Sequence, residues 1–334
     1  MKSIYRCVSF LFLLLSVLHL VAIAQARQPD TSLSADGQLH IILCGTGSPL
    51  PDPARASSCV LVIAGKETFL IDSGPGSWKQ VALTRIPTEA VRTVFLTHLH
   101  SDHIGDLGEA ITQTWIAGRQ EALEVVGPAG TDSVVAGFLA AYAPDRGFRI
   151  AHHGEKALPA SAAKATARVV DIKADESKIV FNRNDVKVTA FRVSHEPVTP
   201  AFGYRIDFAG RSVVISGDTT RNANLARYAK GCDILIHEVV AKEILTFAAA
   251  NFEKAGDPRR AGMLRDILTY HSSPADAAAV AAEAGAATLV LTHIVPPISP
   301  PVSEQMFLRG IEDVFKGKTV LARDGQRFDL PPAK

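Results

Sequence analysis

The stretch Thr97-His98-Leu99-His100-Ser101-Asp102-His103-Ile104-Gly105 places four potential metal ligands within six residues, directly after the apolar run 92–97. His98 and His100 stand two positions apart at the end of an extended strand, so their side chains point to the same side. We expect the chain then to turn into a helix, from which Asp102 and His103 face a second ion. Zinc favours imidazole nitrogen together with carboxylate oxygen. The spacing therefore favours a metal site over the alternative, a histidine-rich surface loop.

Outward from this stretch, apolar strand patterns alternate with helical ones along the chain. Strands are predicted at 39–44, 59–64, 68–72, 92–97, 186–193, 202–208, 211–216, 233–237 and 287–292. Helices are predicted from about 76 to Leu83, over 274–284 and over 303–315, and a hairpin turned by Asp324-Gly325 over 318–330. Such an order predicts two mixed sheets with helices outside, a four-layer αββα sandwich. No linker is visible, so 27–334 is expected to be a single domain.

The N-terminal segment 1–26 has the pattern of a secretory signal peptide. Lys2 and Arg6 precede an apolar stretch, and small-x-small cleavage sites follow at 22–24 and 24–26. The alternative is an N-terminal membrane anchor. No later stretch reaches the roughly 18 apolar residues that span a bilayer. We therefore expect a periplasmic or secreted protein without membrane association after cleavage.

Charge and cysteine content exclude two classes of protein. The 334 residues carry 35 Lys and Arg against 34 Asp and Glu, and loss of Lys2 and Arg6 with the signal leaves a net charge of −1. Such a balance does not suit a protein that depends on phosphate contacts to nucleic acid. Cys44, Cys59 and Cys232 remain, which allows at most one disulfide and one free thiol and excludes a disulfide framework.

The 98–103 motif resembles the H-x-H-x-D-H signature of the metallo-β-lactamase superfamily. Further motifs over 39–330 resemble its ribonuclease Z-like branch, which includes arylsulfatase-like and zinc phosphodiesterase members. These motifs are Gly45-Thr46-Gly47-Ser48-Pro49, Val126-Gly127-Pro128, Gly203-Tyr204-Arg205-Ile206, Gly217-Asp218-Thr219, His237-Glu238 and Tyr270-His271-Ser272-Ser273. The resemblance implies the metallo-β-lactamase fold and two zinc ions per chain.

The resemblance also implies roles for individual residues. The first zinc would be held by His98, His100 and His195, the second by Asp102, His103 and His293, with Asp218 bridging both. Asp72 would orient ligands. His237 either supports the site or is a buried strand end. His271 would be the general acid, with a surface position at a helix start as the alternative, and Asp102 could share in proton handling. His152 and His153 are interpreted as surface residues.

The chain departs from ribonuclease Z in one respect. In ribonuclease Z a long arm that grips tRNA lies between the third histidine and the bridging aspartate, whereas here only 23 positions separate His195 from Asp218. Segments 129–180 and 239–270 are extended instead. The second carries Phe247, Phe252, Arg259 and Arg260 and forms either a helical lid beside the site or an ordinary packed helix pair. We therefore expect a small-molecule or short phosphodiester substrate and no large nucleic-acid interface.

The resemblance implies a secreted dinuclear zinc hydrolase, most of all a phosphodiesterase, in which the metals make water a nucleophile. Hydrolysis of an aryl sulfate, a carboxylic ester, a lactone or a β-lactam is an alternative, as is an iron-dependent redox activity. Lactonases of the superfamily place a tyrosine where Arg221 stands, and iron-dependent redox members place a glutamate where His100 stands, which argues against both. A metal-binding module without activity is the non-enzymatic alternative. A homodimer is compatible with the resemblance.

Overall fold

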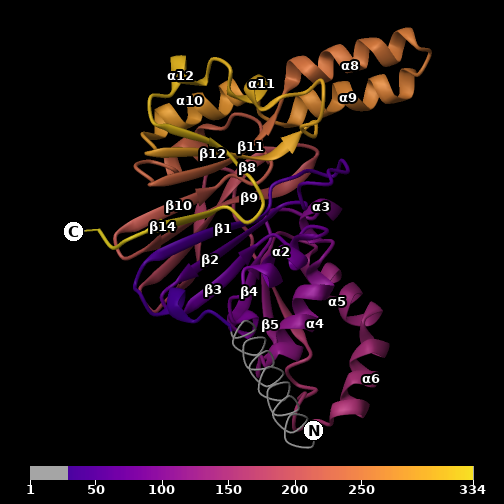
Figure 1. Cartoon of the computed structure of the whole chain (residues 1–334), viewed down its shortest axis with the longest axis vertical. Helices are drawn as coiled ribbons and strands as arrows, with labels where there is room; N and C mark the ends of the chain where they lie inside the picture. Colours follow the sequence, from indigo (N-terminus) through magenta and orange to yellow (C-terminus); the bar gives the residue numbers. More distant parts are fainter. Residues whose placement is uncertain (1–28, 334) are drawn as a thin grey trace, which may run out of the picture.

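The computed structural model describes residues 29–333, so the predicted signal peptide lies outside the described residues. Two seven-stranded sheets face each other (Figure 1). The strand order of the first is β14-β1-β2-β3-β4-β5-β6, and that of the second is β13-β12-β11-β10-β9-β8-β7. In each sheet the strands at one end pair antiparallel and those at the other end parallel, as expected for mixed sheets.

Most strands coincide with the predicted apolar runs, whereas β5, β6 and β7 were not predicted. The first sheet comprises β1 (Leu39–Gly45), β2 (Cys59–Ala64), β3 (Glu67–Ile71), β4 (Val91–Phe95), β5 (Leu123–Gly127), β6 (Ala165–Val169) and β14 (Arg327–Leu330). The second comprises β7 (Ser177–Arg183), β8 (Val186–His195), β9 (Val198–Phe208), β10 (Arg211–Ile215), β11 (Ile234–Val240), β12 (Thr288–Val295) and β13 (Lys318–Leu321).

Strand β1 shows why the central strands are largely apolar on both faces. Leu39, Ile41 and Leu43 pack into the core between the sheets, whereas Ile42 and Cys44 belong to the cluster under the helices of the first sheet. Successive side chains of a strand point to opposite faces, so a strand covered on both faces is largely apolar. The buried exception in β1 is His40, which has hydrogen-bond partners in Asp36 and Asp329. The four-layer αββα sandwich is confirmed.

Helices form the two outer layers (Figure 1). The first sheet is covered by α2 (Ser77–Leu83), α4 (Leu107–Ala117) and α5 (Thr131–Ala141), with α3 (Ser101–Ile104) before α4 and α6 (Ala143–His153) after α5. The second sheet is covered by α7 (Ala223–Tyr228), α10 (Pro274–Ala284), α11 (Glu304–Leu308) and α12 (Ile311–Val314). Short 3-10 turns are η1 (Ser32–Ser34) and η2 (Thr88–Ala90). Helices α8 (Lys242–Lys254) and α9 (Pro258–Tyr270) lie side by side and project beyond the sandwich.

The predicted C-terminal hairpin is wrong. Strand β13 pairs parallel with β12, whereas β14 pairs antiparallel with β1 of the opposite sheet. The Asp324 carboxylate accepts hydrogen bonds from the backbone N–H of Thr46 at 3.0 Å and of Ala56 at 2.6 Å. These bonds hold the turn against the first sheet, so the chain crosses between the sheets instead of folding back on β13.

The predicted helix over 303–315 is also interrupted. It divides into α11 and α12 because Arg309 is extended and Gly310 has a φ of +74°, a conformation that glycine adopts readily. By contrast, α10 begins and ends where predicted, at Pro274 and Ala284. Its Ser273 and Asp276 form a capping box that satisfies two otherwise free N–H groups.

The structure also bears on the expectations about cysteines and membrane-spanning segments. Cys44 and Cys59 form a disulfide between β1 and β2, and Cys232 is a buried free thiol. Between residues 29 and 333 the structure contains no helix with the length and apolar character that a membrane crossing requires.

Candidate active site

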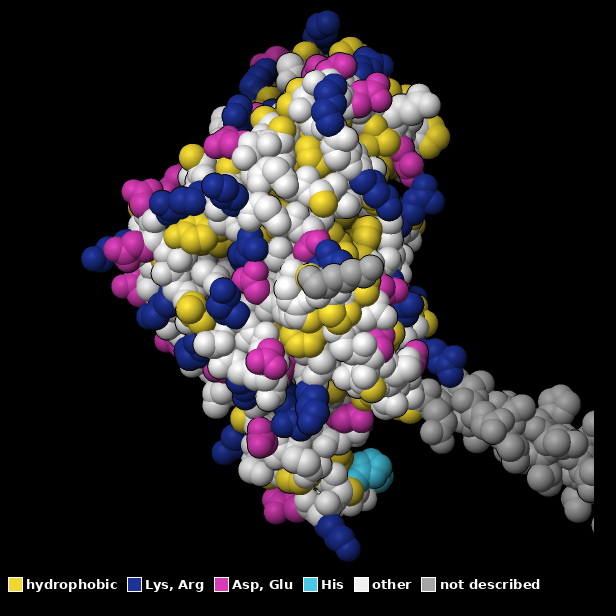
Figure 2. All heavy atoms as spheres, turned by 90° about the vertical axis from the view of Figure 1, so that its left-hand side faces the viewer, with side chains coloured by type: hydrophobic (Ala, Val, Ile, Leu, Met, Phe, Trp, Pro, Cys, Tyr) yellow, Lys and Arg dark blue, Asp and Glu magenta, His cyan; other side chains and the backbone are white. Residues whose placement is uncertain are grey.

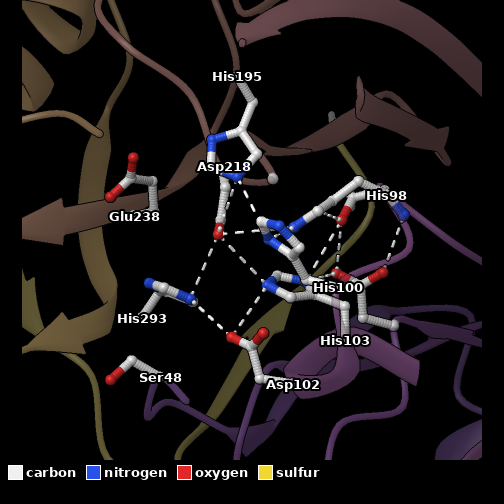
Figure 3. Close-up of polar contacts among 12 residues, drawn as sticks. Ser48, His98, His100, Asp102, His103, His195, Asp218, Glu238 and His293 are labelled. Atoms are coloured by element: carbon white, nitrogen blue, oxygen red, sulfur yellow. Dashed lines mark hydrogen bonds and ion pairs between the residues drawn. The ribbon is translucent and has the colours of Figure 1, made fainter. Parts of the chain in front are cut away.

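The chemistry-bearing side chains meet where strands of both sheets end (Figure 3). Asp72 follows β3, the stretch 97–103 follows β4, and His195 is the last residue of β8. Asp218 follows β10, and His293 lies near the end of β12. Because β3 and β4 run parallel, as do β10, β11 and β12, residues far apart in sequence are brought to one edge.

Local backbone features aim two of these side chains. A Cβ on Gly217 would lie 2.6 Å from the Phe202 carbonyl oxygen, and its φ is +61°, so only glycine fits directly before Asp218. His293 has a φ of 50° and is the unpaired residue of a bulge in β12, opposite Glu238 and Val239. Such a bulge re-aims a side chain, and here the His293 ring is directed towards Asp102 and Asp218.

Asp72, predicted to orient ligands, forms hydrogen bonds with two residues of the motif. Its carboxylate accepts hydrogen bonds from Thr97 N and Thr97 Oγ1, both at 2.8 Å. The same carboxylate accepts a hydrogen bond from His103 Nδ1 at 2.7 Å. With Nδ1 so engaged, His103 presents Nε2 to the centre of the site, the arrangement by which carboxylates orient metal-binding histidines.

Asp218 lies beside the two predicted groups of candidate ligands, and it also forms a third, overlapping group with His271 and His293. His98, His100, His195 and Asp218 form one group, and Asp102, His103 and His293 form another, each with ligand atoms within 4.8 Å of one another. Asp218 Oδ2 lies 3.7 Å from His98 Nε2 in the first group and 3.3 Å from His293 Nε2 in the second. Figure 3 shows the Asp218 carboxylate between the two groups. The structure therefore brings together all seven predicted ligands.

The site fits divalent metal ions by its charge and its donors. His103 Nε2 is buried without a hydrogen-bond partner among residues 29–333, although it lies 3.4 Å from Asp218 Oδ2. Burial and neighbouring His103 hold the pKa of His98 well below its ordinary value, which favours the neutral imidazole that binds metal. Burial lowers the pKa of His293, but Asp218 and Asp102 outweigh it and raise this pKa to about 8. The buried carboxylates thus demand a positive partner, and a divalent ion meets that demand.

His271 and Glu238 form a hydrogen-bonded pair beside these ligands. His271 is buried and its Nδ1 lies 3.1 Å from Glu238 Oε1, which also accepts the Ser272 and Thr219 backbone N–H groups. The His271 ring stacks 5.5 Å from that of His293 and lies 5.0 Å from that of His195. Since Nδ1 faces Glu238, Nε2 is the nitrogen left for the site.

Glu238 is the residue that sequence reasoning missed as a functional candidate. His237, considered in its place, is fully buried in β11, donates from Nδ1 to the Glu238 carbonyl oxygen and belongs to neither ligand group. A carboxylate within a strand buried on both faces was the available signal, because a buried charge needs partners. His152 and His153 end α6 as exposed residues, as predicted.

Residues 67–294 match the family model described as "Beta-lactamase superfamily domain". The chain belongs to the metallo-β-lactamase superfamily. It is 37% identical over 299 residues to a ribonuclease Z of Mycobacterium bovis (89% of this chain, 100% of the relative) and 38% identical over 295 residues to that of Mycobacterium avium (87% and 98%). This family resemblance, and with it a metal-dependent hydrolase, is confirmed.

Solved structures show the same metallo-β-lactamase fold. The metallo-β-lactamase fold protein YhfI from Bacillus subtilis aligns with a TM-score of 0.62 at 19% identity. The alignment covers 87% of this chain and 99% of the YhfI chain. The short form of human tRNase Z aligns with a TM-score of 0.60 at 22% identity, with the same coverage. At these identities the likeness establishes the fold alone.

Two cavities open beside the two groups of candidate ligands. One, of about 490 Å³, opens beside the first ligand group and is lined by His100, His195, Glu196, Pro197, Val198, Asp266, Thr269 and Tyr270. Another, of about 540 Å³, opens beside Asp102 and is bordered by the loop that follows β1. Helices α8 and α9 pack on each other, and the last turn of α9 also forms a wall of the first cavity. Segment 239–270 therefore forms a packed helix pair, and one end of it lies beside the site.

Proposed function

We propose that the protein is a secreted, dinuclear zinc-dependent phosphodiesterase. The observation that carries this proposal is the Asp218 carboxylate, buried between two groups of candidate ligands and beside the His271–Glu238 pair. One ion would be held by His98, His100 and His195, the other by Asp102, His103 and His293, with Asp218 shared. The donor set of imidazoles and carboxylates suits zinc.

Zinc bound here would supply Lewis acidity, which activates water and stabilises charge on the phosphoryl group. The chain's own contribution is proton transfer and orientation. His271 Nε2 would hold the proton that the departing oxygen needs, and Glu238 would keep the His271 ring in place through Nδ1. Asp102, 3.1 Å from His293 Nε2, would share in proton handling as well as binding metal.

Phosphodiesters are favoured over other esters by the relatives named ribonuclease Z, which match this chain along nearly their whole length. Arg221 stands at the position of the lactonase tyrosine, and arginine has no hydroxyl to offer to the site. Its side chain is half exposed and pairs with Glu283 at 3.7 Å. His100 stands where iron redox members carry a glutamate, which supports zinc and hydrolysis.

A small substrate is favoured over a large nucleic acid. Between His195 and Asp218 the chain forms only the β9–β10 hairpin, turned by Ala209 and Gly210. On the face shown in Figure 2, basic and acidic side chains are interspersed and no basic patch dominates. Phosphate-driven binding needs clustered cations.

Export is supported by the N-terminal sequence and by the Cys44–Cys59 disulfide, because disulfides persist mainly in oxidising compartments. The proposal is tested with zinc-loaded protein lacking residues 1–26. We expect it to hydrolyse bis(p-nitrophenyl) phosphate and to lose this activity on chelation. Zinc should restore the activity to the wild type and not to Asp218→Ala. A higher kcat/KM for an aryl sulfate, a lactone or a β-lactam, or iron as the metal bound in the native host, would overturn it.

A further inference from the structure

The cavity beside the first ligand group carries an unusual charge for a site that receives a phosphate ester. Its eight lining residues include two carboxylates, Glu196 and Asp266, and two histidines, but no Lys or Arg. The two carboxylates come from different elements, the β8–β9 turn and α9. Within residues 29–333, neither side chain forms a hydrogen bond or ion pair with another residue. Both remain available to a ligand.

Tyr270 adds an aromatic surface to the same cavity. Asp266, Thr269 and Tyr270 are spaced i, i+3 and i+4 on the last turn of α9, so they share one face of the helix. The Tyr270 ring is fixed against the rings of His195 at 5.3 Å and His271 at 4.8 Å. An aromatic face combined with carboxylates is the chemistry that recognises ammonium groups.

The cavity is continuous with the site that would perform the reaction. His100 and His195 line it, and Tyr270 directly precedes His271. A phosphodiester at the ligand groups would therefore extend one of its two ester groups into this cavity. A further phosphate there would meet two carboxylates, whereas a cation would be attracted.

We propose that this cavity selects phosphodiesters in which one alcohol carries a positively charged ammonium group, bound by Glu196, Asp266 and Tyr270. This inference rests on the proposed phosphodiesterase function and names its substrate class. It also explains how a chain similar to ribonucleases would turn away from polyanions: repulsion acts at the mouth of the site, where an adjoining nucleotide phosphate would lie.

The test compares two esters that differ only in charge. Glycerophosphocholine and the analogue with 3,3-dimethylbutyl in place of choline are nearly isosteric, and ³¹P NMR detects cleavage of either ester bond. We expect kcat/KM of the zinc-loaded protein to be about tenfold higher for the choline ester, since exposed charge pairs contribute a few-fold each. In Glu196→Gln/Asp266→Asn the ratio should fall towards one. Glu243→Gln, which removes an exposed charge of α8 outside the cavity lining, should keep the ratio.

Binding of choline to the metal-free protein is measured alongside the kinetics. Choline should give a saturation-transfer NMR signal with chelator-treated wild-type protein and lose it with the double variant. A wild-type ratio at or below one, or a ratio that the double variant leaves unchanged, overturns the inference. The same holds if neither glycerol ester is cleaved while bis(p-nitrophenyl) phosphate is hydrolysed. If that substrate is not hydrolysed either, the proposed function itself is overturned.

Discussion

Asp218 is the residue on which both groups of candidate ligands depend, because its buried carboxylate lies between them. We expect zinc-supplied, dialysed wild type to hold two ions per chain by elemental analysis. His98→Ala should weaken mainly the first site, His103→Ala mainly the second, and Asp218→Ala both. His153→Ala, at the exposed end of α6, is the matched control and should keep two ions. A wild type without metal, or an Asp218→Ala variant with two ions, would contradict the assignment.

His271 and Glu238 are expected to act on the leaving group and not on metal binding. His271→Ala should lower kcat by about 10²–10⁴ for an alkoxide leaving group and far less for nitrophenolate, which departs without a proton. Glu238→Gln should show the same dependence with a smaller loss, because the amide oxygen still accepts hydrogen bonds. Rates across a leaving-group series decide the matter, with zinc content measured in parallel. Equal losses across the series would make His271 structural, and loss of zinc would make it a ligand.

At the scale of elements, Arg119 shows how a buried cation ties α4 to its surroundings. Its side chain is 2% exposed and donates to the carbonyl oxygens of Ile111, Ala162 and Glu121 and to Thr114 Oγ1. Burial, with nearby Arg92, lowers the pKa of Arg119 to about 10, so the group stays charged at neutral pH. The cation lies near the carbonyl end of the helix, where it is favourable.

Arg119→Met should therefore lower the free energy of unfolding by about 2–4 kcal/mol, because it leaves buried carbonyl groups without donors. Arg92→Met is the control: Arg92 is exposed and pairs with Glu121 at 3.9 Å, so its loss should change stability by less than about 0.5 kcal/mol. Denaturant titrations of both variants give the comparison. Equal effects would show that Arg119 contributes no more than a surface charge.

Apolar runs in the sequence predicted most of the strands, but not all of them. Strands β1 to β3 and β10 to β12 were predicted as apolar runs. Strand β5 was missed although it is largely buried, and β6 and β7, which alternate irregularly between buried and exposed positions, gave no such run. The β13–β14 hairpin was predicted from Asp324-Gly325, yet three hydrogen bonds from Thr46 and Ala56 to Asp324 direct the chain to the other sheet. Those contacts join positions about 270 residues apart, which local patterns do not report.

The candidate site was more predictable than the fold because its residues follow strand ends in a fixed order. The resemblance to the superfamily supplied the grouping of the seven ligand candidates, from the motif at 98–103 and three later strand ends, and the structure brings these residues together. The role of Glu238 could be recognised only from the packing of β11 against α10 and the 270–272 segment. Its partners Thr219, His271 and Ser272 lie elsewhere in the sequence. The cavity walls at Glu196 and Asp266 likewise come from elements that only the folded chain brings together.

At the scale of the whole molecule, export can be tested by the chain's N-terminus and thiols. Intact mass of the protein from its native host should correspond to a chain beginning near Gln25 or Arg27. Burial raises the pKa of Cys232 to about 12, so its thiol should not react at pH 8 until the protein unfolds. Without reductant we expect no reactive thiol in the native state and one after unfolding. A cytosolic chain that retains Met1, with all its cysteines reduced, would contradict export.

The last prediction concerns the choice between RNA and small phosphodiesters. The mycobacterial relatives named ribonuclease Z match nearly the whole described chain, so a ribonuclease is the natural competing expectation. The His195–Asp218 segment nevertheless forms only a short hairpin, the net charge without residues 1–26 is −1, and the cavity beside His195 carries two carboxylates. Since duplex and single-stranded nucleic acids are held mainly through phosphates, precursor tRNA should be processed at its 3′ end very poorly or not at all. The assay sets kcat/KM for precursor tRNA beside that for a small phosphodiester, with the Mycobacterium bovis ribonuclease Z as the comparison enzyme. Cleavage of the precursor as efficient as that of the small ester would show that a polyanion reaches the metal site despite these features.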